Sequence, residues 1–176
     1  MKNKCILTSV LSAFALIGAA NAQTGSGTLG VTATVQGSIN LTFVTDASGL
    51  AVTGTATSTA SLPFGPVSMY SGTVPANVTK TVNGVTSFAL STPFDVRVDL
   101  ANSASTAYTL TATLATADAT NVWLLGAVDI SAAAPHALTA AGVYATPVSY
   151  TLKITIPASM APGLITNSIG FTAVGG

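Results

Sequence analysis

Apolar and small polar residues alternate along several stretches of this 176-residue chain. Over residues 29–43 every odd position except Gly37 is apolar, and the even positions hold glycine or small polar residues. Successive side chains of a strand point to opposite faces, so half-buried antiparallel strands produce this period of two. The same alternation returns over residues 94–100, 108–114, 148–156 and 169–173.

Turn signals separate these stretches. Asn83-Gly84 predicts a two-residue hairpin, because both residues tolerate the positive φ angles that such turns need. Residues 45–60, rich in Thr, Gly, Ala and Ser, predict an edge strand or loop, and residues 157–163 predict a loop that contains two prolines. No long window keeps helical spacing. The sequence therefore predicts one all-β domain over residues 38–176, an antiparallel Ig-like β-sandwich of about eight or nine strands.

The first 22 residues have the features of a secretory signal peptide. Lys2 and Lys4 precede an apolar stretch over residues 6–20, and Ala20-Asn21-Ala22 forms a small-x-small cleavage site. The apolar stretch is short for a bilayer span, which disfavours a retained anchor. We expect export to the periplasm, cell surface or exterior, and a leader over residues 23–37 that contains a donor strand or the first strand.

The expected mature chain is almost free of charge. It keeps three cations and five aspartates: Lys80, Arg97, Lys153, Asp46, Asp95, Asp99, Asp118 and Asp129. The only cysteine, Cys5, lies in the signal, so a disulfide-free domain is predicted. No basic patch suits nucleic acid or an anionic membrane surface. A small outer-membrane barrel would fit the alternation, but 6% aromatic residues is few for its girdles, so no stable membrane insertion is expected.

Few side chains could support catalysis, and the sequence predicts a protein that is not an enzyme and holds no cofactor or metal. The single histidine, His136, is predicted to be an exposed loop residue. Asp95, Arg97 and Asp99 would share a strand face, where Arg97 can pair with either carboxylate; a solvated face is favoured over a polar ligand site. Trp123 lies among aliphatic residues and is predicted to fill the core.

Three short features resemble bacterial secreted sandwich subunits of the pilin-like and spore-coat-U-like families of the chaperone–usher kind. They are the alternating N-terminal stretch, the motif Leu62-Pro-Phe64-Gly65, and Gly163 followed by a last alternating strand through Phe171. Unlike those pilins, the domain has no cysteine, and Gly175 takes the next-to-last position that they give to an aromatic residue.

The resemblance implies assembly by strand exchange. In such families an extended N-terminal segment inserts into the sheet of a neighbouring subunit and fills its core with alternate side chains. Leu29, Val31, Ala33 and Val35 would then be the inserted residues, with copies of the chain and a periplasmic chaperone as partners. The simpler alternative is a hairpin, or a strand kinked at Gly37, that pairs within its own domain.

Two functions remain after these exclusions. The first is a non-catalytic structural protein of the bacterial surface, a pilus-like or coat-like assembly subunit. The second is a monomeric, adhesin-like binding module that would use loops predicted at residues 116–121 and 132–146, since loops on a rigid sandwich often carry recognition.

Overall fold

The computed structural model describes residues 29–176, so the predicted signal peptide and residues 23–28 lie outside the described part. Residues 29–37 belong to no strand. Nine strands follow: β1 (Ser38–Val44), β2 (Thr79–Asn83), β3 (Ser87–Ala101), β4 (Tyr108–Leu114), β5 (Val122–Leu125), β6 (Val128–Asp129), β7 (His136–Gly142), β8 (Val148–Pro157) and β9 (Ile169–Gly175). The described part contains no helix that could span a membrane.

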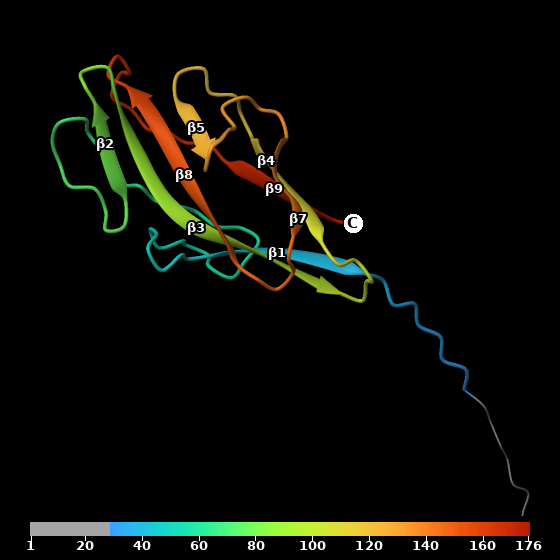
Figure 1. Ribbon diagram of the computed structural model, residues 1–176. Coiled ribbons are helices and arrows are strands. Elements are labelled where there is room, and N and C mark those ends of the chain that lie inside the picture. The colour runs from blue at the N-terminus through green and yellow to red at the C-terminus, as the bar shows by residue number, and fades with distance from the viewer. Residues whose placement is uncertain (1–28) are drawn as a thin grey trace, which may run out of the picture. The chain divides into compact units, whose positions relative to one another are not determined.

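The strands form two antiparallel sheets, which confirms the predicted all-β sandwich. The larger sheet has the order β1-β3-β8-β5-β6, with β2 also paired to β3, and the smaller has the order β7-β4-β9. The long strands β3 and β8 run side by side through the larger sheet (Figure 1). The β2–β3 hairpin has a three-residue turn, not the predicted two, because Asn83 pairs with Ser87 while Gly84 takes a φ of +60°.

The core lies between the two sheets and follows the period of two. In β4 the side chains of Tyr108, Leu110, Ala112 and Leu114 are fully buried, and the threonines between them are not. Strand β3 contributes Phe94, Val96 and Val98 from the opposite sheet, and strand β8 contributes alternate aliphatic side chains. The strands predicted from alternation over residues 94–100, 108–114, 148–156 and 169–173 are therefore confirmed.

The edge strands of the two sheets lie together and run in opposite directions. Strand β1 is at one edge of the larger sheet, and β9 is at one edge of the smaller sheet. The rings of Phe43 and Phe171 are 5.3 Å apart, and a Cβ placed on Gly175 would lie 3.2 Å from Cδ1 of Ile39. The start of β1 thus lies beside the end of β9.

Candidate functional site

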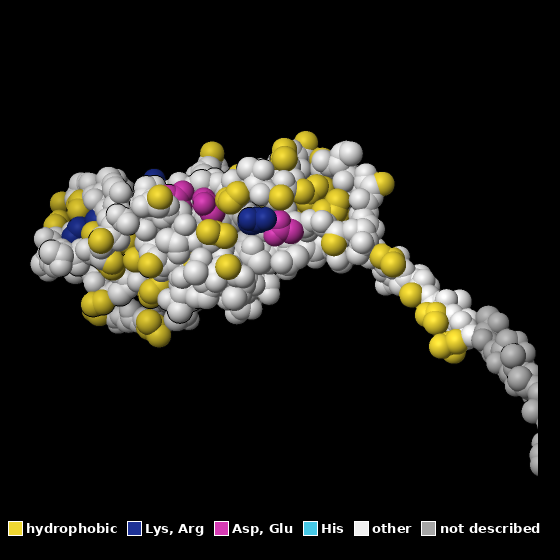
Figure 2. Space-filling model, turned by 90° about the horizontal axis from the view of Figure 1, so that it is seen from below, with side chains coloured by type: hydrophobic (Ala, Val, Ile, Leu, Met, Phe, Trp, Pro, Cys, Tyr) yellow, Lys and Arg dark blue, Asp and Glu magenta, His cyan; other side chains and the backbone are white. Residues whose placement is uncertain are grey.

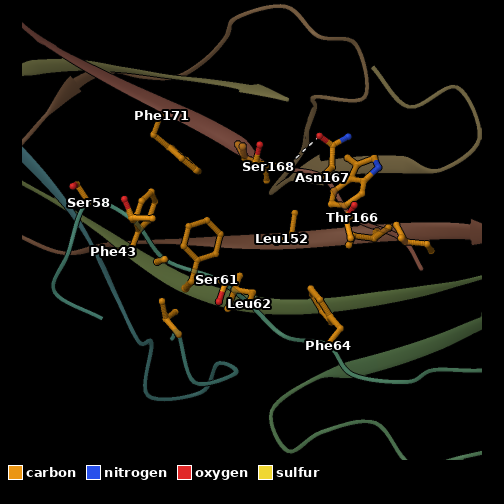
Figure 3. A pocket seen from close by; sticks show the side chains of 18 residues that line it. Phe43, Ser58, Ser61, Leu62, Phe64, Leu152, Thr166, Asn167, Ser168 and Phe171 are labelled. Atoms are coloured by element: carbon orange, nitrogen blue, oxygen red, sulfur yellow. Dashed lines mark hydrogen bonds between the residues drawn. The ribbon is translucent and has the colours of Figure 1, made fainter. Parts of the chain in front are cut away.

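A cleft of about 450 Å³ opens into the core beside β9. Residues 58–64 form one wall, and residues 165–171, which include the start of β9, form the other (Figure 3). We call this hollow the β9 cleft. Side chains from both sheets form its floor: Phe43, Phe94, Phe171, Trp123, Leu152 and Ile154.

Three phenylalanines from three strands meet in the cleft. The ring of Phe171 lies 5.3 Å from that of Phe43 and 6.0 Å from that of Phe94, both edge-to-face, and Phe43 lies 6.4 Å from Phe94. These separations fall within the range in which aromatic pairs attract each other. The floor of the cleft is therefore apolar, and its three phenylalanine rings pack against one another.

One edge of β9 is paired with β4, and in the described chain no strand pairs with its other edge. The Ser168 carbonyl accepts from Ala115 N–H, and Gly176 N–H donates to the Ala107 carbonyl, so the even-numbered residues direct their polar groups toward β4. Backbone groups alternate in direction along a strand. The N–H and C=O groups of the odd-numbered residues of β9 therefore face away from β4, where no strand of the described chain pairs with them.

The opposite wall offers a second partly unpaired backbone. Ser61 exchanges both backbone hydrogen bonds with Thr53, and Phe43 N–H donates to the Thr57 carbonyl. In the described chain no backbone hydrogen bond engages Ala60 or Leu62, the residues on either side of Ser61. The cleft thus lies between two chain segments that each have free hydrogen-bonding groups, as an extended peptide would require.

A loop held by hydrogen bonds supports one end of the cleft. The carboxylate of Asp118 accepts hydrogen bonds from Thr120 N–H (3.0 Å), Asn121 N–H (2.9 Å), the Asn121 side-chain amide (2.9 Å) and Trp123 Nε1 (2.8 Å). Burial raises the pKa of Asp118, but these hydrogen bonds outweigh it and lower the pKa from 3.8 to about 2. Trp123 is a core residue, as predicted, and it also lines the cleft.

Among the described residues, no charged side chain lines the β9 cleft. Within residues 29–176, no three His, Cys, Asp or Glu side chains gather closely enough to hold a metal ion. The cleft therefore presents an apolar floor, backbone polar groups and a few hydroxyl and amide side chains. This combination suits an extended, uncharged chain segment.

Carboxylates do meet elsewhere, on the outer face of the larger sheet. Asp46 accepts hydrogen bonds from Ser149 Oγ (2.7 Å) and from the backbone and hydroxyl of Ser48 (2.8 and 2.7 Å), and these lower the pKa of Asp46 to about 2. Burial, and then the charge of Asp46, raises the pKa of Asp95. The sequence left open whether Arg97 pairs with Asp95 or with Asp99. In the structure the guanidinium of Arg97 pairs with the carboxylate of Asp99 at 2.9 Å.

The structure brings three of the motif residues predicted from sequence to the cleft. Leu62, Phe64 and Phe171 line it, and Gly65 follows with a φ of +68°. Gly163 lies in the β8–β9 loop, outside the residues that line the cleft.

The alternating segment, residues 29–35, belongs to no strand. The side chains of Leu29, Val31 and Val35 are 88%, 82% and 72% exposed. Pairing of this segment as a hairpin or long strand within its own domain stays a prediction. Hydrophobic side chains follow one another along this stretch, beside the grey residues in Figure 2.

Besides the length of the β2–β3 turn, two further predictions were wrong. His136 is not an exposed loop residue: it begins β7, pairs with Ala112 of β4, and its Nε2 is buried with no hydrogen-bond partner among the described residues. Residues 132–146 are not one binding loop, because β7 occupies their middle. Both errors have one cause, since β7 is rich in Ala and lacks large alternating side chains.

The sequence did not indicate the floor and walls of the cleft beyond the motif residues. Phe43 and Phe94 had the pattern of ordinary core positions, and residues 58–60 belonged to a stretch predicted as an edge strand or loop. Comparison with protein-family models, with curated proteins and with solved structures found no match to this chain.

Proposed function

We propose that this chain is an exported, non-catalytic structural subunit of the bacterial surface, which assembles with copies of itself by accepting a β-strand in the β9 cleft. The observation that carries the proposal is the pair of unpaired backbone edges above an open apolar floor. A strand placed between them would satisfy both edges and cover the three phenylalanines.

The alternating segment supports the choice of a second copy as the partner. Three large aliphatic side chains of residues 29–35 are left in water, and burial contributes about 1.5–3 kcal/mol for each such side chain. Neither the segment nor the cleft lining carries a charge, so no ion would be desolvated when they meet. A periplasmic chaperone that covers the cleft before assembly is part of the same proposal.

The test uses residues 23–176 expressed with export to the periplasm. Unboiled and boiled samples are compared on an SDS gel, and the same material is imaged by negative stain. We expect a ladder or filaments that disappear on boiling. Deletion of residues 23–35 should leave only monomer.

A point variant with a matched control sharpens this test. Val31 and Val143 are both exposed valines, 82% and 64%, so Val31→Asp and Val143→Asp should each leave the isolated subunit folded. Val31→Asp should abolish the ladder because it would bury an unpaired carboxylate, whereas Val143→Asp should preserve the ladder. A ladder that survives Val31→Asp contradicts the proposal.

A monomeric binding module is the second candidate, and the rigid loop held by Asp118 favours it. Loops fixed on a sandwich can present a recognition surface without assembly. A single monomer in boiled and unboiled samples, together with binding to a glycan or matrix-protein array that is lost when residues 116–121 are replaced, would establish this function instead.

A further inference from the structure

Two carboxyl groups meet on the outer face of the larger sheet, where the chain leaves β1. Asp95 of β3 lies opposite Val44 of β1 on one side and opposite Ser149 of β8 on the other. Asp46 follows the end of β1, and its carboxylate accepts a hydrogen bond from Ser149 Oγ at 2.7 Å. A hydrogen bond also joins the carboxyl groups of Asp46 and Asp95. One of the two must carry a proton for this bond to form.

Among the described residues, no cation forms an ion pair with either carboxyl group. The next residue of β3 on the same face is Arg97, whose guanidinium pairs with Asp99 at 2.9 Å. Strand β1 and residues 143–149 carry no charged side chain. The cation of β8, Lys153, lies four residues beyond the residue opposite Asp95. When both carboxyl groups are ionised, their repulsion is therefore not compensated by a bound cation.

Protonation of Asp95 removes this repulsion. Burial, and then the charge of Asp46, raises the pKa of Asp95 above its usual 3.8. Hydrogen bonds from Ser149 and Ser48 lower the pKa of Asp46 to about 2. Between these two pKa values Asp95 is a neutral donor and Asp46 is an ionised acceptor. As the pH rises through the raised pKa of Asp95, the proton leaves, so the contact is strongest in mild acid.

The turn that begins at Asp46 fixes the chain to β3. The Asp46 carbonyl accepts from Gly49 N–H at 2.9 Å. Gly49 lies so close to the carbonyl of Pro93 that a Cβ atom would overlap it. Leu50 is buried, and its N–H donates to Thr92 Oγ1 at 2.7 Å. The position of the Asp46 carboxylate and the seating of residues 46–50 on β3 are therefore linked.

Hydrogen bonds continue from this turn to residues 58–64, which we call the cleft wall. Thr45, the neighbour of Asp46, accepts from Val52 N–H at 3.0 Å through its hydroxyl. Val52 lines the β9 cleft. The next residue, Thr53, exchanges both backbone hydrogen bonds with Ser61 of the cleft wall. A contiguous path of bonds thus connects the carboxyl pair with the cleft wall.

We propose that Asp46 and Asp95 form an acid-closed latch for the cleft wall. In mild acid the shared proton holds residues 45–49 against the larger sheet and keeps the cleft wall in place. At neutral pH the two carboxylates repel each other, and the cleft wall opens locally more often. The latch belongs to the single subunit. Only its consequence for assembly, slower release of an inserted segment in acid, rests on the proposed function.

Hydrogen exchange on unassembled chain, residues 23–176 isolated by gel filtration, measures the latch at pH 4 and pH 7. After division by the intrinsic exchange rate at each pH, amides of residues 52–61 should be at least about threefold more protected at pH 4. This difference should exceed that of the amides of β4, which report global unfolding. Asp95→Asn places an amide donor beside Asp46 and should give the acid level of protection at both pH values. Asp99→Asn, on the same strand and face, is the matched control and should keep the difference of the parent chain.

Three results would overturn the latch: equal protection of residues 52–61 at the two pH values, a difference that survives Asp95→Asn, or a difference that Asp99→Asn abolishes. Trp123 fluorescence verifies that each variant is folded. If Asp95→Asn does not fold, NMR of the carboxyl carbons in the parent chain decides the question. Asp95 should titrate above pH 3.8, and the amide signals of residues 52–61 should change with the same midpoint. A different midpoint overturns the proposal.

Assembly is scored separately. Assembled chain should release subunits at least about threefold more slowly at pH 4 than at pH 7, and with Asp95→Asn release should be slow at both pH values. Release that ignores pH, or that Asp95→Asn does not change, shows that the latch does not act on the occupied cleft and overturns that consequence. Absence of any ladder from the unboiled parent chain refutes the proposed function, whereas the exchange result on the single subunit decides the latch.

Discussion

Replacement of Asp118 by asparagine should loosen the loop that supports one end of the β9 cleft. The carboxylate accepts four hydrogen bonds, one of them from Nε1 of Trp123. Asparagine has almost the same shape, but it carries no charge and only one acceptor oxygen. The change therefore tests the charge and the second acceptor without creating a cavity.

The magnitude follows from the ionisation of Asp118. The difference between a pKa of 3.8 and one of about 2 corresponds to about 2.4 kcal/mol in favour of the ionised folded state. Because the side chain is only half-buried, solvent screening reduces the expected contribution to about 1–2 kcal/mol. A lowered carboxyl pKa stabilises the fold above pH 3.8, and this stability is lost as the pH falls through about 2.

Urea unfolding followed by the fluorescence of Trp123, the only tryptophan, measures the effect. At pH 7 Asp118→Asn should lower the free energy of unfolding by about 1–2 kcal/mol, and the difference from the parent protein should shrink steadily between pH 4 and pH 2. Asp129→Asn is the comparison variant and should have the smaller effect, since Asp129 is exposed and, among the described residues, its carboxylate accepts from Ser131 alone, which also lowers the pKa of Asp129. A difference that is absent at pH 7, or unchanged at pH 2, would refute this account of the loop.

Three further changes test other parts of the fold. Asp95→Asn should raise stability at pH 7, because burial and the charge of Asp46 raise the pKa of Asp95, so that its ionised form opposes folding. The benefit should fade on acidification, as the parent protein gains stability when the pH falls through that raised pKa; a benefit that grows in acid would contradict this. Gly142→Ala should lower the free energy of unfolding by about 1–3 kcal/mol, because its methyl group would overlap the ring of Tyr108. An unchanged melting temperature would show that the ring moves aside freely. Ala56→Gly should raise stability by about 1 kcal/mol in chemical unfolding, because Ala56 holds a φ of 61° that glycine adopts without strain; a decrease would mean that the side chain contributes contacts that outweigh the strain.

The alternation of apolar and polar residues was sufficient to predict the strands whose one face is buried. Strands β3, β4, β8 and β9 carry apolar side chains, many of them large, at most of their alternate positions, and burial of one face enforces that pattern. Strand β7 was missed because its Ala and Thr residues give no contrast between faces. His136 was misplaced for the same reason.

The cleft could not be predicted from periodicity, because it depends on strand order. Phe43 and Phe94 have the pattern of any core residue, and the sequence does not show that β9 ends as the unpaired edge of the smaller sheet. The motif around Leu62 was the only sequence signal for the opposite wall. Which side of a sandwich stays open is decided by how distant segments pair, and local pattern contains no information on that pairing.

The position of β9 along the chain has a consequence for the timing of synthesis. The alternating segment precedes every strand and leaves the ribosome early, whereas β9 follows the eight other strands and is translated after them. If subunits assemble as proposed, the alternating segment of a nascent chain is available for insertion into another subunit before the chain's own β9 cleft has been completed. A translation product that stops before Ile169 would keep the segment and lack one wall of the cleft. Such a fragment could join an existing chain of subunits and would then block the addition of the next, so small amounts of truncated product should shorten the filaments.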